Sequence, residues 1–427
     1  MNGFTLGQHG GFELLSQGFS PTSISEGDVR LGYERALKEL LVQRVEISTD
    51  AKTFVNSSAA GGLRMTVHGL TYNMTTRAAR EAALGAGAII KMVTAGLLDE
   101  TALVEIRNID PNIILLAGGV DFGEKETVIK NARLLASLDL KAPVVFAGNA
   151  ALRNQIQEVF SQHGIEFLLA ENVFPEVDVL NTLPLRKVIH EVFNKHIIHA
   201  PGMQHLSEMT SGRIIPTPGA VLLAAELFAE ACGDCLVFDV GGATTDVHSV
   251  TGGTPEWITR QLEPEPFAKR TVEGDLGVFI NARNTLDLDK DLIDPEELSE
   301  LKPIPDSSSE KSLTRRLCSI AVETSIRRHA GIVMDTYTPT GRKQSVRGKD
   351  LSAVKWVVGT GGALTRIEGG REILSRICTG PGKYLFPPGD AKILIDKDYR
   401  FSALGTLASE YPEQVRTTFR NWVLEEE

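Results

Sequence analysis

Short apolar runs alternate with longer segments of helical periodicity in the first half of the chain. The runs 113–117 (IILLA) and 144–147 (VVFA) each lead into glycine, and helical patterns follow them at 125–138 and 151–163. A further apolar run at 165–170 continues the alternation. Buried strands that alternate with amphipathic helices are typical of βαβ units, so this part of the chain predicts an α/β fold.

A second block of the same character begins near Pro216. An Ala/Leu-rich helix is predicted from Thr217 through Ala231, with proline in the first turn, where a helix tolerates it. An apolar strand, a glycine bend and a return strand to Val250 follow, and 355–358 is another buried strand. The second block is therefore also α/β.

Between the return strand to Val250 and the strand at 355–358, the sequence predicts an exposed connection and then a helix. Residues 286–312 are acidic, contain prolines and include three consecutive serines, which predicts an exposed connection. Residues 313–330 form a basic amphipathic pattern that predicts a helix. Because the two blocks have similar content, we expect two related halves, 1–215 and 216–427.

Composition narrows the classes of partner. The chain has 427 residues, a net charge of −11 and a sequence pI of about 5.4, which argues against binding to nucleic acid. Four cysteines and the lack of an apolar run near 18 residues predict a cytoplasmic protein that does not enter a membrane. Cys232 and Cys235 form a C-x-x-C pair without a second pair at zinc spacing, and we expect ordinary thiols.

The segment 239–246 (DVGGATTD) is a candidate phosphate-binding bend. Gly241 and Gly242 could supply positive φ and leave backbone N–H groups open to a phosphate, and Thr244 and Thr245 add hydroxyl donors. The flanking Asp239 and Asp246 could hold a magnesium ion through water. An ordinary β-hairpin with a Gly-Gly turn explains the same residues, and spacing alone does not decide between the two.

A second glycine-rich loop follows the strand at 355–358. Gly359, Gly361 and Gly362 would let a base or ribose lie against the backbone. The loop lacks the G-x-G-x-x-G spacing of a dinucleotide site, and the chain has no P-loop motif.

Three weaker candidates have equally good structural explanations. Arg270, Glu273 and Asp275 surround a glycine and form either a charged loop near a ligand or a solvated turn. Three histidines lie close together in sequence without zinc spacing, and we expect them on a solvated face: His190, His196 and His199. The pair Gly61-Gly62 could simply end a strand.

Eight blocks along nearly the whole chain resemble the glutamate mutase accessory proteins of the MutL/GlmL type, members of the actin-like ATPase superfamily. The blocks are SSAAGGLRM (57–65), AALGAGA (82–88), IILLAGGVDFG (113–123), IIPTPGAVL (214–222), DVGGATTDVHSV (239–250), RTVEGDLGV (270–278), AVETSIRRHAG (321–331) and VVGTGGAL (357–364).

The resemblance implies an actin-like (ribonuclease H-like) fold with two halves around a nucleotide cleft. By analogy, 239–246 is the second phosphate motif and 359–362 the adenosine motif. It implies ATP and Mg²⁺ as cofactors, and Asp239, Glu273 and Asp275 as catalytic residues. Asp239 and Asp246 are the implied residues for the metal.

The implied activity is that of an ATP-dependent reactivating factor for a coenzyme B12-dependent mutase. Nucleotide-driven motion would loosen the mutase so that intact coenzyme replaces a damaged one. The implied partners are the mutase subunits, and self-association is a further possibility. A small-molecule kinase on the same fold is the least favoured alternative.

The chain departs from the superfamily pattern at its start. Actin-like ATPases begin with a first phosphate hairpin resembling D-x-G-S-T-x-T-K, which is absent here, while 11–18 (GFELLSQG) resembles the strand after it. We expect either a truncated start or a protein that natively lacks this motif, and favour truncation. In the second case the protein would be a non-catalytic nucleotide-binding scaffold.

Overall fold

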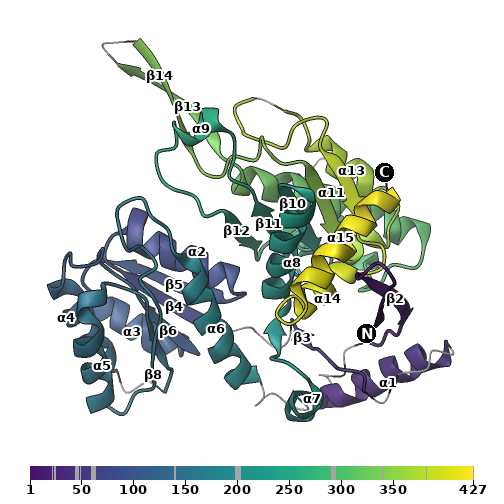
Figure 1. Ribbon diagram of the computed structural model, residues 1–427. Helices are drawn as coiled ribbons and strands as arrows, with labels where there is room; N and C mark the ends of the chain where they lie inside the picture. Colours follow the sequence, from purple (N-terminus) through teal and green to yellow (C-terminus); the bar gives the residue numbers. More distant parts are fainter. Residues whose placement is uncertain are drawn as a thin grey trace. The chain divides into compact units, whose positions relative to one another are not determined.

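The chain folds into two units. A computed structural model describes residues 1–21, 23, 26–43, 48, 50–58, 64–138, 141–197, 203–289, 295–338, 341–380 and 382–426 (Figure 1). The first unit comprises Met1 and Gln17–Gly219, and the second Asn2–Ser16 and Ala220–Glu427.

The first unit contains a parallel five-stranded sheet of order β5-β4-β6-β7-β8. Its strands are β4 (Arg64–Gly69), β5 (Ile89–Ala95), β6 (Ile113–Leu116), β7 (Val144–Phe146) and β8 (Phe167–Leu169). The strands predicted at 113–117, 144–147 and 165–170 are therefore confirmed. Numbered along the chain, the order is 2-1-3-4-5, which is that of a doubly wound α/β domain.

Helices cover both faces of this sheet. They are α2 (Arg77–Gly85), α3 (Glu100–Ile109), α4 (Glu126–Ala136), α5 (Arg153–Gln162) and α6 (Thr182–Ile197). Side chains alternate across a strand, so Leu115 joins the core under α2 and α6, while Leu116 joins the core under α3, α4 and α5. Burial on both faces explains why the strands are continuous apolar runs.

The second unit contains a mixed five-stranded sheet of order β12-β11-β10-β15-β16. Its strands are β10 (Cys235–Val240), β11 (Thr245–Val250), β12 (Ala268–Glu273), β15 (Trp356–Thr360) and β16 (Lys392–Ile395). The first three pair antiparallel, and β10, β15 and β16 run parallel. The hairpin predicted around 239–246 and the strand at 355–358 are thus confirmed.

Two helical layers enclose the second sheet. The long helix α11 (Ser308–His329) packs its Leu313 and Leu317 into the core beside Phe238. Aromatic rings fill the layer of α8 (Thr217–Cys232), α14 (Arg400–Leu407) and α15 (Pro412–Glu426), where the Phe228 ring contacts Trp356, Phe401 and Phe419. The predicted helix at 217–231 is confirmed as α8.

The remaining elements are short or lie outside both sheets. They are β1 (Asn2–Leu6), β2 (Phe12–Gln17), α1 (Val29–Val42), β3 (Asn56–Ser57), η2 (Tyr72–Thr76), η3 (Ala150–Leu152), α7 (Met203–Met209), β9 (Ile215–Pro216), α9 (Pro255–Ile258), α10 (Ala282–Leu286), η4 (Pro295–Glu300), β13 (Ile332–Thr338), β14 (Gly341–Arg347), α12 (Gly362–Thr365) and α13 (Gly370–Arg376).

The boundary between the units, after Gly219, lies close to the predicted one at residue 215. The two sheets differ in strand order and direction, because similar content does not determine how strands pair. The β1–β2 ribbon, expected to open the first half, belongs to the second unit. There the Phe12 N–H donates to Thr418 Oγ1 at 2.7 Å.

Helix α11 also begins earlier than predicted. The Ser307 side chain accepts from the Glu310 N–H, and the Glu310 side chain accepts in return from the Ser307 N–H. This capping box makes the serine triplet the start of a helix rather than part of an exposed connection.

Candidate functional site

The two glycine-rich motifs meet at one edge of the second sheet. Asp239 near the end of β10 is the register partner of Asp246 in β11 and of Thr360 in β15. A Cβ placed on Gly361 would lie 2.6 Å from Asp239 Oδ1 and 2.5 Å from the Val240 carbonyl oxygen. The bend at 239–246 and the loop at 359–362 therefore touch.

Several carboxylates lie on the same face of the second sheet, where these strands end. Register partners in a sheet point to the same face, so Asp239, Asp246 and Thr360 share one. The buried Asp396, directly after β16, joins them by accepting from Thr360 Oγ1 at 3.1 Å. We call Asp239, Asp246 and Asp396 the carboxylate cluster.

Two of the predicted acids lie elsewhere. Glu273 is the register partner of Thr245, one residue before Asp246, and so points to the opposite face of the sheet. Arg328 of α11 binds Glu273 at 2.6 Å and Asp275 at 2.8 Å. The structure thus separates Glu273 and Asp275 from Asp239 and occupies both with a guanidinium.

The carboxylate cluster carries more negative charge than its one paired cation balances. Arg270 contacts Asp246 Oδ1 at 2.6 Å, and both side chains are nearly buried. Burial, then the charges of Asp246 and Asp396, raises the pKa of Asp239 to about 7. Burial likewise raises the pKa of Asp396 to about 6, against the opposing effect of N–H donors from Phe401 and Arg400.

This arrangement suits a hard cation that keeps most of its own water. The described residues contain no group of three His, Cys, Asp or Glu side chains placed to hold a metal directly. Magnesium needs only one or two carboxylates and retains several waters. Asp239 is partly exposed, while Asp246 and Asp396 are buried, so Asp239 is the carboxylate open to such an ion.

The bend itself does not use glycine as expected. Neither Gly241 nor Gly242 has positive φ, because four residues separate Val240 from Thr245 and the wider loop closes with ordinary dihedrals. The Gly242 carbonyl accepts from the N–H groups of Phe279 and Ile280 at 2.8 and 2.7 Å. Thr245 is buried and its hydroxyl donates to the Leu276 carbonyl at 3.0 Å, whereas Thr244 is partly exposed.

Glycine is required at Gly361 instead. Its φ is +83°, and the approach to Asp239 and Val240 leaves no room for a side chain. Gly359 is buried in β15 against Leu374. Gly362 is exposed at the start of α12, where an added Cβ would lie 3.1 Å from the Tyr399 hydroxyl.

Sequence analysis missed several residues at this edge. Asp396 follows the apolar run 393–395 much as Asp239 closes an apolar run, and that signal could have identified it. Tyr399 next to Gly362, with the Arg366 guanidinium 5.1 Å from its ring centroid, has no comparable signal. Nothing in the spacing links Arg328 to Glu273, because the two are 55 residues apart.

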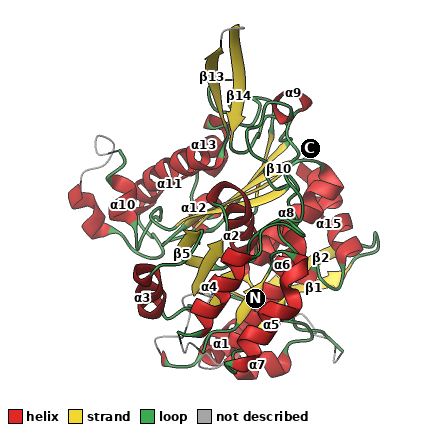
Figure 2. Ribbon diagram, turned by 90° about the vertical axis from the view of Figure 1, so that its left-hand side faces the viewer, coloured by secondary structure: helices red, strands yellow, loops and turns green. Residues whose placement is uncertain are grey.

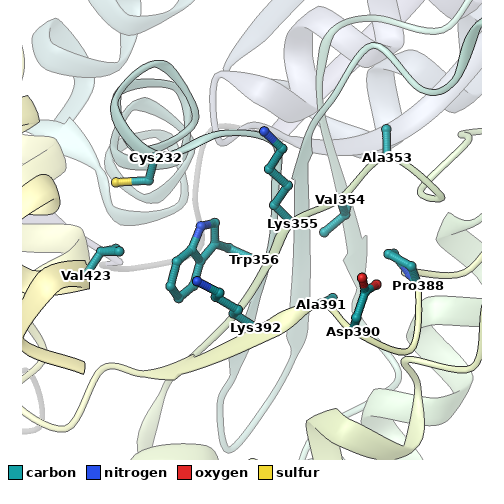
Figure 3. Close-up of a pocket in the computed structure, with 10 residues that line it drawn as sticks. All are labelled: Cys232, Ala353, Val354, Lys355, Trp356, Pro388, Asp390, Ala391, Lys392 and Val423. Carbon is teal, nitrogen blue, oxygen red and sulfur yellow. The ribbon is translucent and has the colours of Figure 1, made fainter. Parts of the chain in front are cut away.

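A pocket of about 410 Å³ lies at the other end of the same strands (Figure 3). Trp356 and Lys392, the first residues of β15 and β16, help to line it. The Lys392 ammonium lies 5.3 Å from the Trp356 ring centroid. This pocket is separate from the carboxylate cluster and is not the site predicted from the glycine motifs.

The other candidates singled out from the sequence are the histidines, the Gly61-Gly62 pair and the cysteines. The His190 Nε2 is buried, so this ring is not on a solvated face, and burial lowers its pKa to about 4. His196 is exposed. His199 and Gly61-Gly62 lie outside the described residues. Cys235 is buried, and its thiol donates to the Ala225 carbonyl oxygen at 3.4 Å. Neither Cys232 nor Cys235 forms a disulfide.

The molecule is thus an α/β protein with a carboxylate cluster at the edge of a mixed sheet. The MutL protein family matches residues 3–423. Protein MutL of Clostridium tetanomorphum is 37% identical over 425 residues, which cover 93% of this chain and 92% of that protein. The chain belongs to the MutL protein family.

A solved structure of nucleotide-free acetone carboxylase, titled for ATP-dependent acetone carboxylation, is also similar. It is 13% identical with a TM-score of 0.40, covering 95% of this chain and 68% of that one. A likeness of this size says nothing about activity. Among the residues described, no helix is both long and apolar enough to span a bilayer.

Proposed function

We propose that this protein is an ATP-dependent accessory factor that reactivates a coenzyme B12-dependent mutase of the glutamate mutase type. Membership of the MutL family supports the link to glutamate mutase. The observation that carries the nucleotide assignment is the contact between the bend and the loop at Asp239 and Gly361, because one ligand could then reach both motifs.

We assign the second unit to the actin-like (ribonuclease H-like) class. Its three antiparallel strands followed by two parallel ones agree with that fold. The triphosphate would lie against the backbone of Gly241, Gly242 and Thr244, and the adenosine against the loop of Gly359, Gly361 and Gly362. Mg²⁺ would be held through water by Asp239, with Asp246 behind it.

The protein's own groups act mainly by position and charge. The carboxylate cluster repels an unaccompanied triphosphate, so it favours nucleotide that arrives with its cation. A bound cation would supply charge neutralisation for the phosphates. Arg270 holds Asp246, and Thr360 and two backbone N–H groups hold Asp396, so the carboxylate cluster stays fixed while a ligand binds.

A second candidate function is a nucleotide-binding scaffold without catalysis. The observation in its favour is that Arg328 pairs with both Glu273 and Asp275, two of the three acids expected to be catalytic. In this case nucleotide binding alone would change the affinity for the mutase.

One experiment separates these functions. A mutase inactivated by bound hydroxocobalamin is incubated with adenosylcobalamin, this protein, Mg²⁺ and either ATP or a non-hydrolysable analogue. If mutase activity recovers with ATP but not with the analogue, the result supports an ATPase. Equal recovery of mutase activity with both nucleotides supports the scaffold. No recovery with either nucleotide contradicts the proposed function.

A further inference from the structure

A two-stranded ribbon stands apart from the sheet of the second unit. We call β13 and β14, which pair antiparallel from Ile332↔Arg347 to Thr338↔Gly341, the arm. Figures 1 and 2 both show the arm standing out from the rest of its unit. A lone two-stranded ribbon is marginally stable in water, so a projecting one needs support at its base or from a partner.

The base of the arm is anchored. Val346 is fully buried, its N–H donates to the Arg260 carbonyl at 2.9 Å, and its carbonyl accepts from the Leu262 N–H at 2.9 Å. On the other strand, the Val333 N–H donates to the Lys383 carbonyl at 2.8 Å. These bonds fix the direction of the arm.

The outer part of the arm is exposed. Asp335 to Tyr337 and Gly341 to Lys343 are all exposed, and the Tyr337 side chain is 80% exposed. Tyrosine and arginine are enriched at the centres of protein interfaces, and Tyr337 lies directly opposite Arg342.

The arm has a net positive charge, whereas the chain as a whole is negatively charged. The arm has three cations and one acid, whereas the whole chain has a net charge of −11. Arg342 is neutralised by a two-point ion pair with Asp335 on its own face. Lys343 and Arg347 share the other face, and no described acidic side chain lies within ion-pair distance of either.

We propose that the arm inserts into an acidic groove of the mutase, where Lys343 and Arg347 on one face of the arm are the electrostatic contacts and Tyr337 on the opposite face is the apolar contact. Complementary charge of this kind steers association and fixes orientation. This inference rests on the proposed function, because it names the contact surface for the same partner.

The test measures binding of the purified mutase, with its cobalamin, to immobilised full-length protein at low and physiological salt. Lys343→Glu/Arg347→Glu is expected to weaken binding at least ten-fold, mainly by slowing association, and Tyr337→Ser to speed dissociation. The matched control Lys311→Glu/Arg420→Glu makes the same charge change at two exposed positions outside the arm, and should change affinity less than two-fold.

Affinity of the arm variant equal to that of the wild type would overturn the inference while leaving the proposed function intact. Wild-type protein that neither binds nor reactivates the mutase would instead overturn the proposed function and the inference with it. Sedimentation velocity provides a further outcome: a dimer that the arm substitutions dissociate, with mutase affinity unchanged, would make the arm a contact between copies of this chain. That result also overturns the inference.

Discussion

At the scale of single residues, glycine has different roles at the two motifs. Gly361 has positive φ and lies against Asp239, whereas Gly242 has neither constraint, since an added Cβ there meets only Phe279 at 3.4 Å. From the sequence alone, Gly242 and Gly361 could not be distinguished. Backbone dihedrals and close approaches depend on how the strands pair, so the sequence could identify the motifs but not the glycine that cannot be replaced.

Gly361→Ala is therefore expected to be the damaging substitution. Strain at positive φ and the clash with Val240 should together cost about 1–3 kcal/mol of unfolding free energy. Urea unfolding measures this change, and nucleotide affinity should fall as the loop shifts. Gly242→Ala is the matched control and should stay within about 0.5 kcal/mol of the wild type. Equal destabilisation by both substitutions would contradict the assignment.

The pKa of Asp239 predicts how stability depends on pH. Because the pKa is raised from 3.8 to about 7 in the folded protein, the folded state binds a proton more tightly than the unfolded state. Asp239 therefore contributes stability that is fully present below pH 3.8 and is lost as pH rises through about 7.

Asp239→Asn should reduce this decline. Unfolding free energies from urea titrations at several pH values between 4 and 8 check the prediction. A decline of the same size in wild type and variant would show that Asp239 is not the group responsible.

At the scale of elements, the alternation of apolar runs and helical patterns identified most of the framework. β6, β7, β8, β10, β11, β15, α4, α5 and α8 all lie where the pattern indicates. The failures have physical causes. The start of α11 depends on a reciprocal side-chain cap. The outer part of the arm has no regular alternation of apolar and polar residues, because both of its faces are exposed there.

The capping box predicts the effect of changing the start of α11. Ser307→Ala removes the acceptor for the Glu310 N–H and should cost about 0.5–2 kcal/mol of unfolding free energy. Ser308→Ala, at the neighbouring exposed position, is the control, because the Ser309 hydroxyl itself contacts the Ser307 hydroxyl at 3.0 Å. If urea unfolding shows no difference between the two variants, the cap does not stabilise this helix.

The link between α11 and β12 predicts what Arg328 does. Arg328→Gln would leave the largely buried Glu273 without its cation, which should cost about 1–3 kcal/mol. Asp275 is exposed, so Asp275→Asn should change stability by less than about 1 kcal/mol. Nucleotide affinity should be unchanged in both variants. A loss of nucleotide affinity in either variant would show that the substituted residue belongs to the nucleotide site.

At the scale of the whole molecule, the sequence indicated an α/β protein but not the relation between its parts. Both units contain alternating strands and helices, and that alternation suggested two related halves. Strand order is decided by pairings between residues distant in sequence, such as Cys235 with Trp356, which local periodicity does not report. The first unit instead has a doubly wound sheet of its own.

The most direct test of the central claim compares Mg·ATP with metal-free ATP in binding to the wild type and to Asp239→Asn by isothermal titration calorimetry. If the carboxylate cluster holds the cation, the wild type should bind Mg·ATP at least ten-fold more tightly than metal-free ATP. Asp239→Asn should lose most of that difference, because the carboxylate open to the ion is gone. Equal affinities for the two forms in the wild type, or an undiminished difference in the variant, would contradict the assignment of this edge as a Mg·ATP site.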